Sequence, residues 1–166
     1  MTPSQPLDTP LWAFSLAVYG GDGVADECLD LQERLGLDLN ILLFAAFIGA
    51  AEGVRLEVSD IAAANAEVAH WQSEIVRPLR QVRRTLKPMS AEGLRAQVKA
   101  AELEAEKIEQ GLLWQWSRRQ LADRPRVDRA GALAENLRAV FEFYRTPDRS
   151  ETALPRLLAA ATAYGP

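Results

Sequence analysis

Hydrophobic and polar residues follow one another along the chain at intervals of three or four, the spacing of amphipathic α-helices. No stretch alternates convincingly with the period of two that is typical of a half-buried β-strand. Capping residues, glycines and prolines divide this pattern into segments. We therefore predict an all-α fold, a helical bundle with helices over about 10–19, 24–35, 38–52, 60–87, 90–120, 128–144 and 152–163.

The most apolar segment is LDLNILLFAAFIGAA, residues 37–51. It is shorter than the roughly 20 residues that a membrane span needs. Its apolar residues cover all sides of a helix, as expected for a helix surrounded by others. We predict a central buried helix over about 38–52, in which Asn40 hydrogen-bonds exposed backbone groups or a neighbour such as Gln32.

Two long amphipathic segments follow, over about 60–87 and 90–120. Because the connection between them is short, we expect an antiparallel helical hairpin. Pro78 is expected to kink or divide the first helix, since proline lacks the N–H donor and clashes one turn back. The predicted apolar stripes are Ile61, Val68, Trp71, Ile75, Leu79, Val82 and Leu86 in the first helix and Leu94, Val98, Ala101, Ala105, Ile108, Leu112 and Trp116 in the second.

The chain has 166 residues, of which 48% are hydrophobic and 25% charged, a composition that fits one globular domain over 1–166. Residues 1–8 lack a basic start followed by an apolar run, so we expect a flexible tail and no signal peptide. The single cysteine, Cys28, cannot form an intramolecular disulfide, which favours a cytoplasmic protein. Acidic neighbours disfavour its thiolate, so we predict a packed, inert thiol.

Charge is divided unevenly along the chain. Residues 1–70 carry 2 Lys/Arg against 11 Asp/Glu, and residues 71–166 carry 17 against 12. One interpretation is that the two halves attract each other in the folded protein. The other is that the second half presents a basic surface to an acidic partner.

In the segment VRPLRQVRRTLK, basic residues recur at intervals of three or four, so they form a row along one face of the predicted helix. This basic ridge could meet an acidic protein surface or phosphates, or it could be a solvated helix face. The acidic isoelectric point of about 5.1 disfavours nucleic acid. One turn apart on the second hairpin helix, Arg118 can stack over Trp114. The predicted partner-binding residues are Arg77, Arg80, Arg83, Arg84, Lys87, Trp114 and Arg118.

The sequence offers no complete catalytic or metal-binding set. Glu67, His70 and Glu74 fall on one helix face, but a dinuclear carboxylate site needs a second histidine, and His70 is the only one. We predict no catalytic residue, no metal and no cofactor. An alternative is a small enzyme or ligand-binding protein with a pocket near Trp12 and Gln32, next to Asn40.

Three segments together are similar to a known family: LWAFSLAVYG, GVADECLDLQERLGLDLNILLF and VRPLRQVRRTLK. They resemble a family of short bacterial proteins catalogued as having unknown function, over roughly residues 7–120. The resemblance implies a bacterial, cytoplasmic, helical protein and brings no activity, cofactor or ligand. We therefore predict a non-enzymatic protein-interaction or regulatory module whose basic ridge binds an acidic protein partner, with a ligand-binding pocket or nucleic-acid binding through the same ridge as alternatives.

Overall fold

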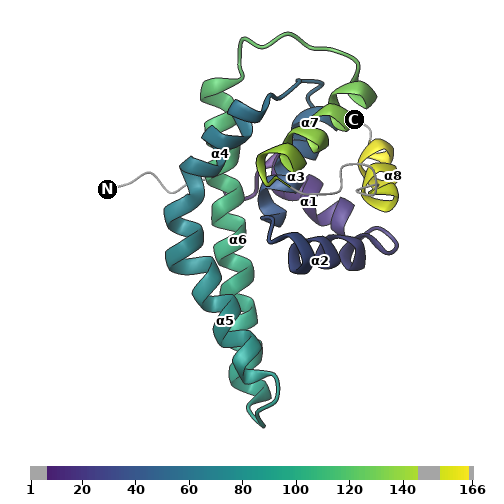
Figure 1. The fold of residues 1–166 in the computed structure, drawn as a ribbon. Helices are drawn as coiled ribbons and strands as arrows, with labels where there is room; N and C mark the ends of the chain where they lie inside the picture. Colours follow the sequence, from purple (N-terminus) through teal and green to yellow (C-terminus); the bar gives the residue numbers. More distant parts are fainter. Residues whose placement is uncertain (1–6, 146–153, 165–166) are drawn as a thin grey trace.

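The computed structural model describes residues 7–145 and 154–164, which form eight α-helices and one π-helical segment (Figure 1). The predicted all-α fold is confirmed. A long hairpin stands beside a group of shorter helices and extends beyond them (Figure 1). The hairpin consists of α4 (Val58–Trp71), the π-helical segment η1 (Gln72–Val76), α5 (Arg77–Leu86) and α6 (Glu92–Gln120). The shorter helices are α1 (Pro10–Tyr19), α2 (Val24–Leu35), α3 (Leu39–Ala50), α7 (Arg129–Phe143) and α8 (Pro155–Ala163).

Two predicted segments extend past the described residues. Most of the expected tail, residues 1–6, lies outside them, as do residues 152 and 153 at the predicted start of the last helix. Within the described segments no helix has both the length and the apolar character needed to cross a membrane.

Local sequence signals account for the start of α1, the end of α2 and the start of α3. Thr9 caps α1 by accepting a hydrogen bond from the Trp12 N–H at 3.1 Å. Gly36 ends α2 in the left-handed conformation with φ of 64°, which glycine adopts without steric penalty. The carboxylate of Asp38 then caps α3 and accepts the Asn40 N–H at 2.9 Å.

α3 is the central helix, as predicted, and every side chain from Asn40 to Ala50 is buried. The backbone of α7 passes very close to the backbone of α3 where the two helices cross. At Gly49 an added Cβ would lie 2.6 Å from the backbone N and Cα of Leu133, so the two backbones are nearly in contact. The fully buried Asn136 of α7 holds the chain that leaves α3, donating to the carbonyls of Ala45 and Val54 and accepting the Leu56 N–H.

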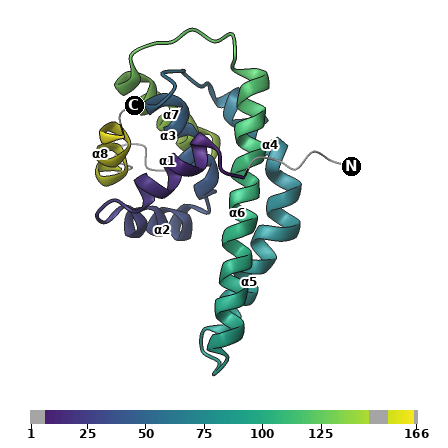
Figure 2. The same cartoon turned by 180° about the vertical axis from the view of Figure 1, so that it is seen from behind.

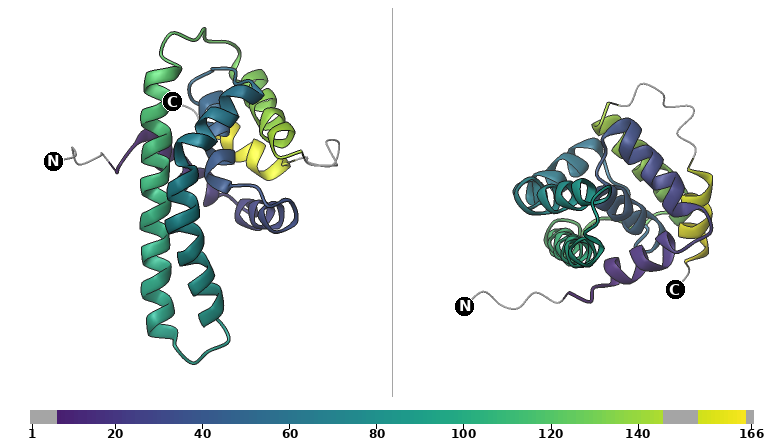
Figure 3. Two further views of the ribbon diagram at one scale, coloured as in Figure 1. Left: turned by 60° about the vertical axis from the view of Figure 1, so that its left-hand side comes forward. Right: turned by 90° about the horizontal axis from the view of Figure 1, so that it is seen from below.

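The two arms of the hairpin run antiparallel side by side, as predicted (Figure 3). The apolar stripe predicted for the first arm is wrong at Ile75 and Val82, which are 36% and 46% exposed, whereas Leu79 and Leu86 are partly buried. The π-helical segment η1 explains the difference. It places one extra residue in a turn and ends two residues before Pro78, which has no N–H for an α-helical bond. One extra residue rotates all later side chains by about 100°, so Arg80 and Arg83 face α6 in place of Val82.

The stripe predicted for α6 is also partly wrong, since Leu94 and Ala101 are exposed. Towards the middle of α6 the buried face carries polar residues: Glu102, Glu109 and Gln110. These side chains are buried because α5 and α3 supply hydrogen-bonding partners for them.

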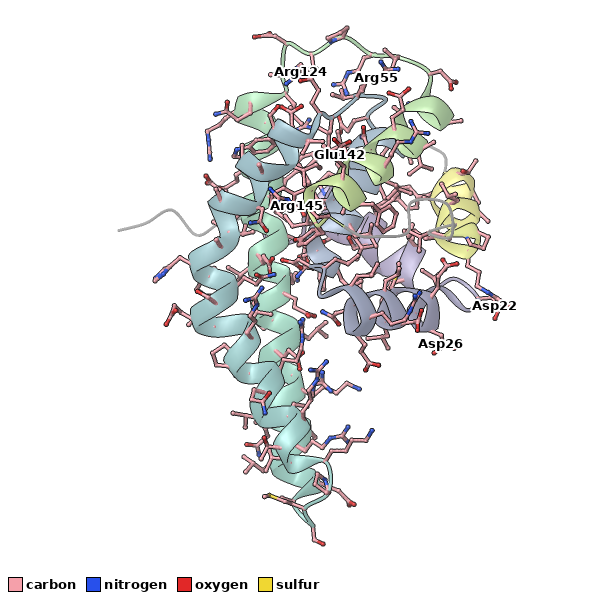
Figure 4. All side chains as sticks on the ribbon, viewed as in Figure 1. Asp22, Asp26, Arg55, Arg124, Glu142 and Arg145 are labelled. Atoms are coloured by element: carbon pink, nitrogen blue, oxygen red, sulfur yellow. The ribbon has the colours of Figure 1, made fainter. Side chains whose placement is uncertain are left out.

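Ion pairs between the acidic first half and the basic second half support the first interpretation of the charge division. Arg124, at the end of the molecule opposite the hairpin tip (Figure 4), bonds Asp60 at 2.7 Å. Although burial disfavours the charge of Glu52, its pKa is held below the ordinary value by Arg126 and Arg118. Further pairs of this kind are Arg119–Glu67 and Lys107–Asp8.

Candidate functional site

The basic ridge does not form one continuous solvent-facing surface. Arg80, whose side chain is 17% exposed, donates to Glu102 at 3.1 Å and to Glu106 at 2.8 Å. Arg83 is paired with Glu102 as well. Burial disfavours the charge of Glu102, yet these two arginines hold its pKa below the ordinary value, whereas burial outweighs Arg80 and raises the pKa of Glu106.

The other three residues of the ridge are exposed. Arg77, Arg84 and Lys87 form no ion pair or side-chain hydrogen bond with any residue in the described part of the chain. The predicted ridge is thus divided into two groups. Arg80 and Arg83 bind glutamates of α6 and so join α5 to α6, and the other three cations face solvent.

Trp114 and Arg118 lie further along α6, towards its C-terminal end and away from the hairpin tip. The Arg118 guanidinium is 4.2 Å from the centre of the Trp114 ring, so the predicted stacking is observed. Trp114 also packs edge-on against Phe47 of α3, and Arg118 contacts Glu52 at 3.2 Å. Both side chains therefore have partners within the fold, and they do not join the ridge in one surface.

A groove of about 400 Å³ lies between the first helices and the hairpin. Figure 2 shows α1 on this side of the molecule, between α6 and α8. The structure brings Trp12, Gln32 and Asn40, the three residues of the alternative pocket, together in the lining of this groove. Its other apolar lining residues are Leu16, Tyr19, Leu29, Leu39, Leu43 and Leu103.

The polar lining of the groove contains two buried atoms without a partner. Ser15 and Gln110 are 3% and 2% exposed, and among the described residues Ser15 Oγ and Gln110 Oε1 have no hydrogen-bond partner. The orientation of the Gln110 amide is fixed, since its Nε2 donates to Asn40 Oδ1 at 2.9 Å. Asn40 is fixed in turn, because its Nδ2 donates to Glu109 Oε2 at 3.0 Å. Gln110 therefore presents a free acceptor.

A pair of buried carboxyl groups supports this arrangement. Glu109 is fully buried beside Asp38, and its Oε1 has no hydrogen-bond partner among the described residues. Burial, and secondly the charge of Asp38, raises the pKa of Glu109 to about 10. Asp38 also accepts a hydrogen bond from Gln72. The partners of Asn40 are thus Glu109 and Gln110 of α6, and the expected bond to Gln32 is absent from the described hydrogen bonds.

The family model for proteins of unknown function, DUF2390, matches residues 10–113, well over half of the chain. The chain belongs to the DUF2390 family. The resemblance expected from the sequence is confirmed. No curated protein and no solved structure matches the chain.

The part of this DUF2390 protein that the family model matches includes the whole groove. The lining residues run from Trp12 to Gln110, and the carboxyl pair also falls between residues 10 and 113. No sequence signal marks Glu109 as buried, because a glutamate between Ile108 and Gln110 on an amphipathic helix is ordinarily a surface residue.

The surroundings of Cys28, His70 and Glu67 give none of these residues a catalytic or metal-binding arrangement within the described part of the chain. Cys28 is fully buried, and burial, with the charge of Glu27 second, raises the pKa of its thiol to about 12. This agrees with the predicted inert thiol. His70 is exposed and Glu67 is paired with Arg119. Over residues 7–145 and 154–164, no three His, Cys, Asp or Glu side chains gather in a way that would hold a metal ion.

Arg80→Gln and Arg84→Gln form a matched pair of variants on α5. Arg80→Gln leaves Glu106 and part of Glu102 without a cation in a half-buried site, so we expect a loss of about 1–3 kcal/mol in the free energy of unfolding. Arg84→Gln removes an exposed, unpaired charge and should change stability by about 0.5 kcal/mol or less. Urea denaturation of both variants measures the difference. Equal, small effects would show that the Arg80 pairs contribute nothing to the hairpin.

Proposed function

We propose that this DUF2390 protein binds a small organic molecule in the groove between α1, α2 and the hairpin. The observation that carries the proposal is the pair of buried, unpartnered atoms, Ser15 Oγ and Gln110 Oε1, in an otherwise mostly apolar groove. Leaving a buried polar atom unpaired costs about 1–3 kcal/mol. A ligand that supplies the missing hydrogen bonds recovers this free energy. The groove volume of about 400 Å³ is typical of ligand sites.

The two atoms define the polar part of the ligand. Gln110 Oε1 only accepts, so the ligand needs an O–H or N–H donor, whereas Ser15 Oγ both donates and accepts. A hydroxyl group on the ligand suits either atom, because it can accept from Ser15 and can donate to Gln110. The walls, which include Trp12, Leu16 and Leu103, require that the rest of this part of the ligand be apolar.

N-phenylnaphthylamine (NPN) is a suitable probe, because it is uncharged, apolar and carries one N–H donor. We expect saturable binding of one molecule per chain, seen as a rise in NPN fluorescence with energy transfer from Trp12. Leu16→Glu and Leu103→Glu place a charge on exposed positions of the wall and should each weaken binding about tenfold.

Val127→Glu is the matched control. Val127 is another exposed apolar residue, in the connection between α6 and α7, and it does not line the groove. Its substitution should leave NPN binding unchanged. Non-saturable binding, or an equal loss in Val127→Glu, would contradict the proposal.

A protein partner with an acidic surface is a second proposal, supported by the exposed cations Arg77, Arg84 and Lys87 and by the exposed apolar residues Val82 and Met89 near the hairpin tip. Its support is weaker than the sequence suggests, because the two other arginines of the ridge are engaged by glutamates of α6. Nucleic-acid binding through the same three cations has less support still, since phosphate binding draws on a larger cluster of free basic side chains.

A further inference from the structure

A second hollow, of about 520 Å³, adjoins the groove. We call it the basic cleft; three of its lining residues, Arg77, Arg80 and Arg84, come from α5. The facing side is formed by the end of α2 and the start of α3. Gln32 and Arg80 line both the groove and the basic cleft, so the two hollows meet at these side chains.

Two arginines of the basic cleft are available to a ligand. Arg77 and Arg84 lie two helical turns apart on α5, about 10 Å along the axis, and neither has an ion pair or side-chain hydrogen bond within the described segments. Arg80 between them is held by Glu102 and Glu106. The acidic residues of the cleft are Glu33, at the exposed end of α2, and Asp38, which is buried and accepts hydrogen bonds from the Asn40 N–H and from Gln72.

We propose that the ligand of the groove is an anionic amphiphile whose oxyanion head is bound by Arg77 and Arg84 in the basic cleft. This inference rests on the proposed function of the groove. The head is a carboxylate, sulfonate or phosphate, for which the planar guanidinium group offers paired N–H donors. The apolar body passes Gln32 and Arg80 into the groove, where its hydroxyl or N–H group meets Ser15 or Gln110.

The shared boundary favours one ligand over two. Arg80 is fixed by its two glutamates, so the boundary between cleft and groove keeps its shape without a ligand. The unpartnered atoms lie on the groove side of this boundary, and Arg77 and Arg84 lie on the cleft side. Lys99 is a further cation, in the lining of the groove. A single molecule with an apolar body and an anionic end satisfies both sets of groups.

Anilinonaphthalenesulfonate (ANS) tests the inference, because it is NPN with a sulfonate group added. We expect the full-length protein to bind ANS about tenfold more tightly than NPN, the effect of a charge-assisted hydrogen bond. In the double variant Arg77→Gln/Arg84→Gln, the affinity for ANS should fall about tenfold while the affinity for NPN stays unchanged. Decanoate and decyl phosphate should displace ANS better than decanol does, and their ranking distinguishes a carboxylate from a phosphate head.

Arg129→Gln/Arg138→Gln is the control, since both arginines belong to α7, line neither hollow, and remove the same net charge. An equal loss of ANS affinity in this control would overturn the inference, because it would show only a long-range charge effect. Equal affinities of wild type for ANS and NPN, with NPN still lost in Leu103→Glu, would overturn the anionic head and leave the groove proposal standing. Loss of saturable binding for both probes would contradict the groove itself.

Discussion

Glu109→Gln is expected to stabilise the protein by roughly 3 kcal/mol at pH 7 and to flatten its stability between about pH 5 and pH 10. The pKa of Glu109 is raised to about 10 in the folded protein, from an ordinary value of 4.5. Between these values the folded state holds a proton that the unfolded state releases, so stability falls as the pH rises. Glutamine is neutral at every pH, and its side-chain oxygen can still accept the hydrogen bond from Asn40.

Urea denaturation at pH 5, 7 and 9 measures this effect. The advantage of Glu109→Gln over wild type should be small at pH 5 and should grow at each step. Glu104→Gln, an exposed substitution on the same helix, is the control and should follow wild type. A constant difference between Glu109→Gln and wild type across this range would show that Glu109 is ionised in the folded protein.

Gly49→Ala is expected to destabilise the protein by about 3 kcal/mol, at the upper end of the range for overpacked cores. The new Cβ would lie 2.6 Å from backbone atoms of Leu133, and a backbone cannot move aside as a flexible side chain does. α3 and α7 would have to separate, and the fully buried Asn136, which bridges α3 to the following loop, would be displaced with α7. Thermal and urea denaturation measure the loss.

Gly93→Ala is the matched control for this substitution. Gly93 also lies in a helix, but an added Cβ there meets no atom within 4 Å. Because alanine favours helix formation, this variant should gain about 0.5–1 kcal/mol. A Gly49→Ala protein as stable as wild type would show that the crossing of α3 and α7 can widen without loss.

The sequence was sufficient for the elements of the fold whose determinants are local. Spacing and caps predicted α3 as the central helix and α4 to α6 as a hairpin, because helix periodicity and capping depend on neighbouring residues. Gln32 and Asn40 could be grouped with Trp12 before the structure, because buried polar groups next to apolar helices need partners. That these residues bind a ligand stays a prediction.

The network behind the groove could not be predicted, since it depends on contacts between distant residues. Asn40 and Glu109 are 69 positions apart, and nothing near either residue marks Glu109 as buried. The inward turn of Arg80 was missed for a different reason. It depends on the π-helical segment, and the period of 3.6 residues assumed for an uninterrupted helix does not hold across it.

The π-helical segment makes the character of the hairpin depend on the length of the chain as well as on its composition. A chain one residue shorter between Trp71 and Arg77 would continue as an ordinary α-helix, with Val82 turned towards α6 and Arg80 turned away from it. The same residues would then form an apolar interface between the two arms and a solvent-exposed basic face. Arg80 would no longer be bound by glutamates at the boundary between groove and cleft. The insertion of a single residue is thus enough to convert an ordinary amphipathic hairpin into one with charged side chains between its two arms.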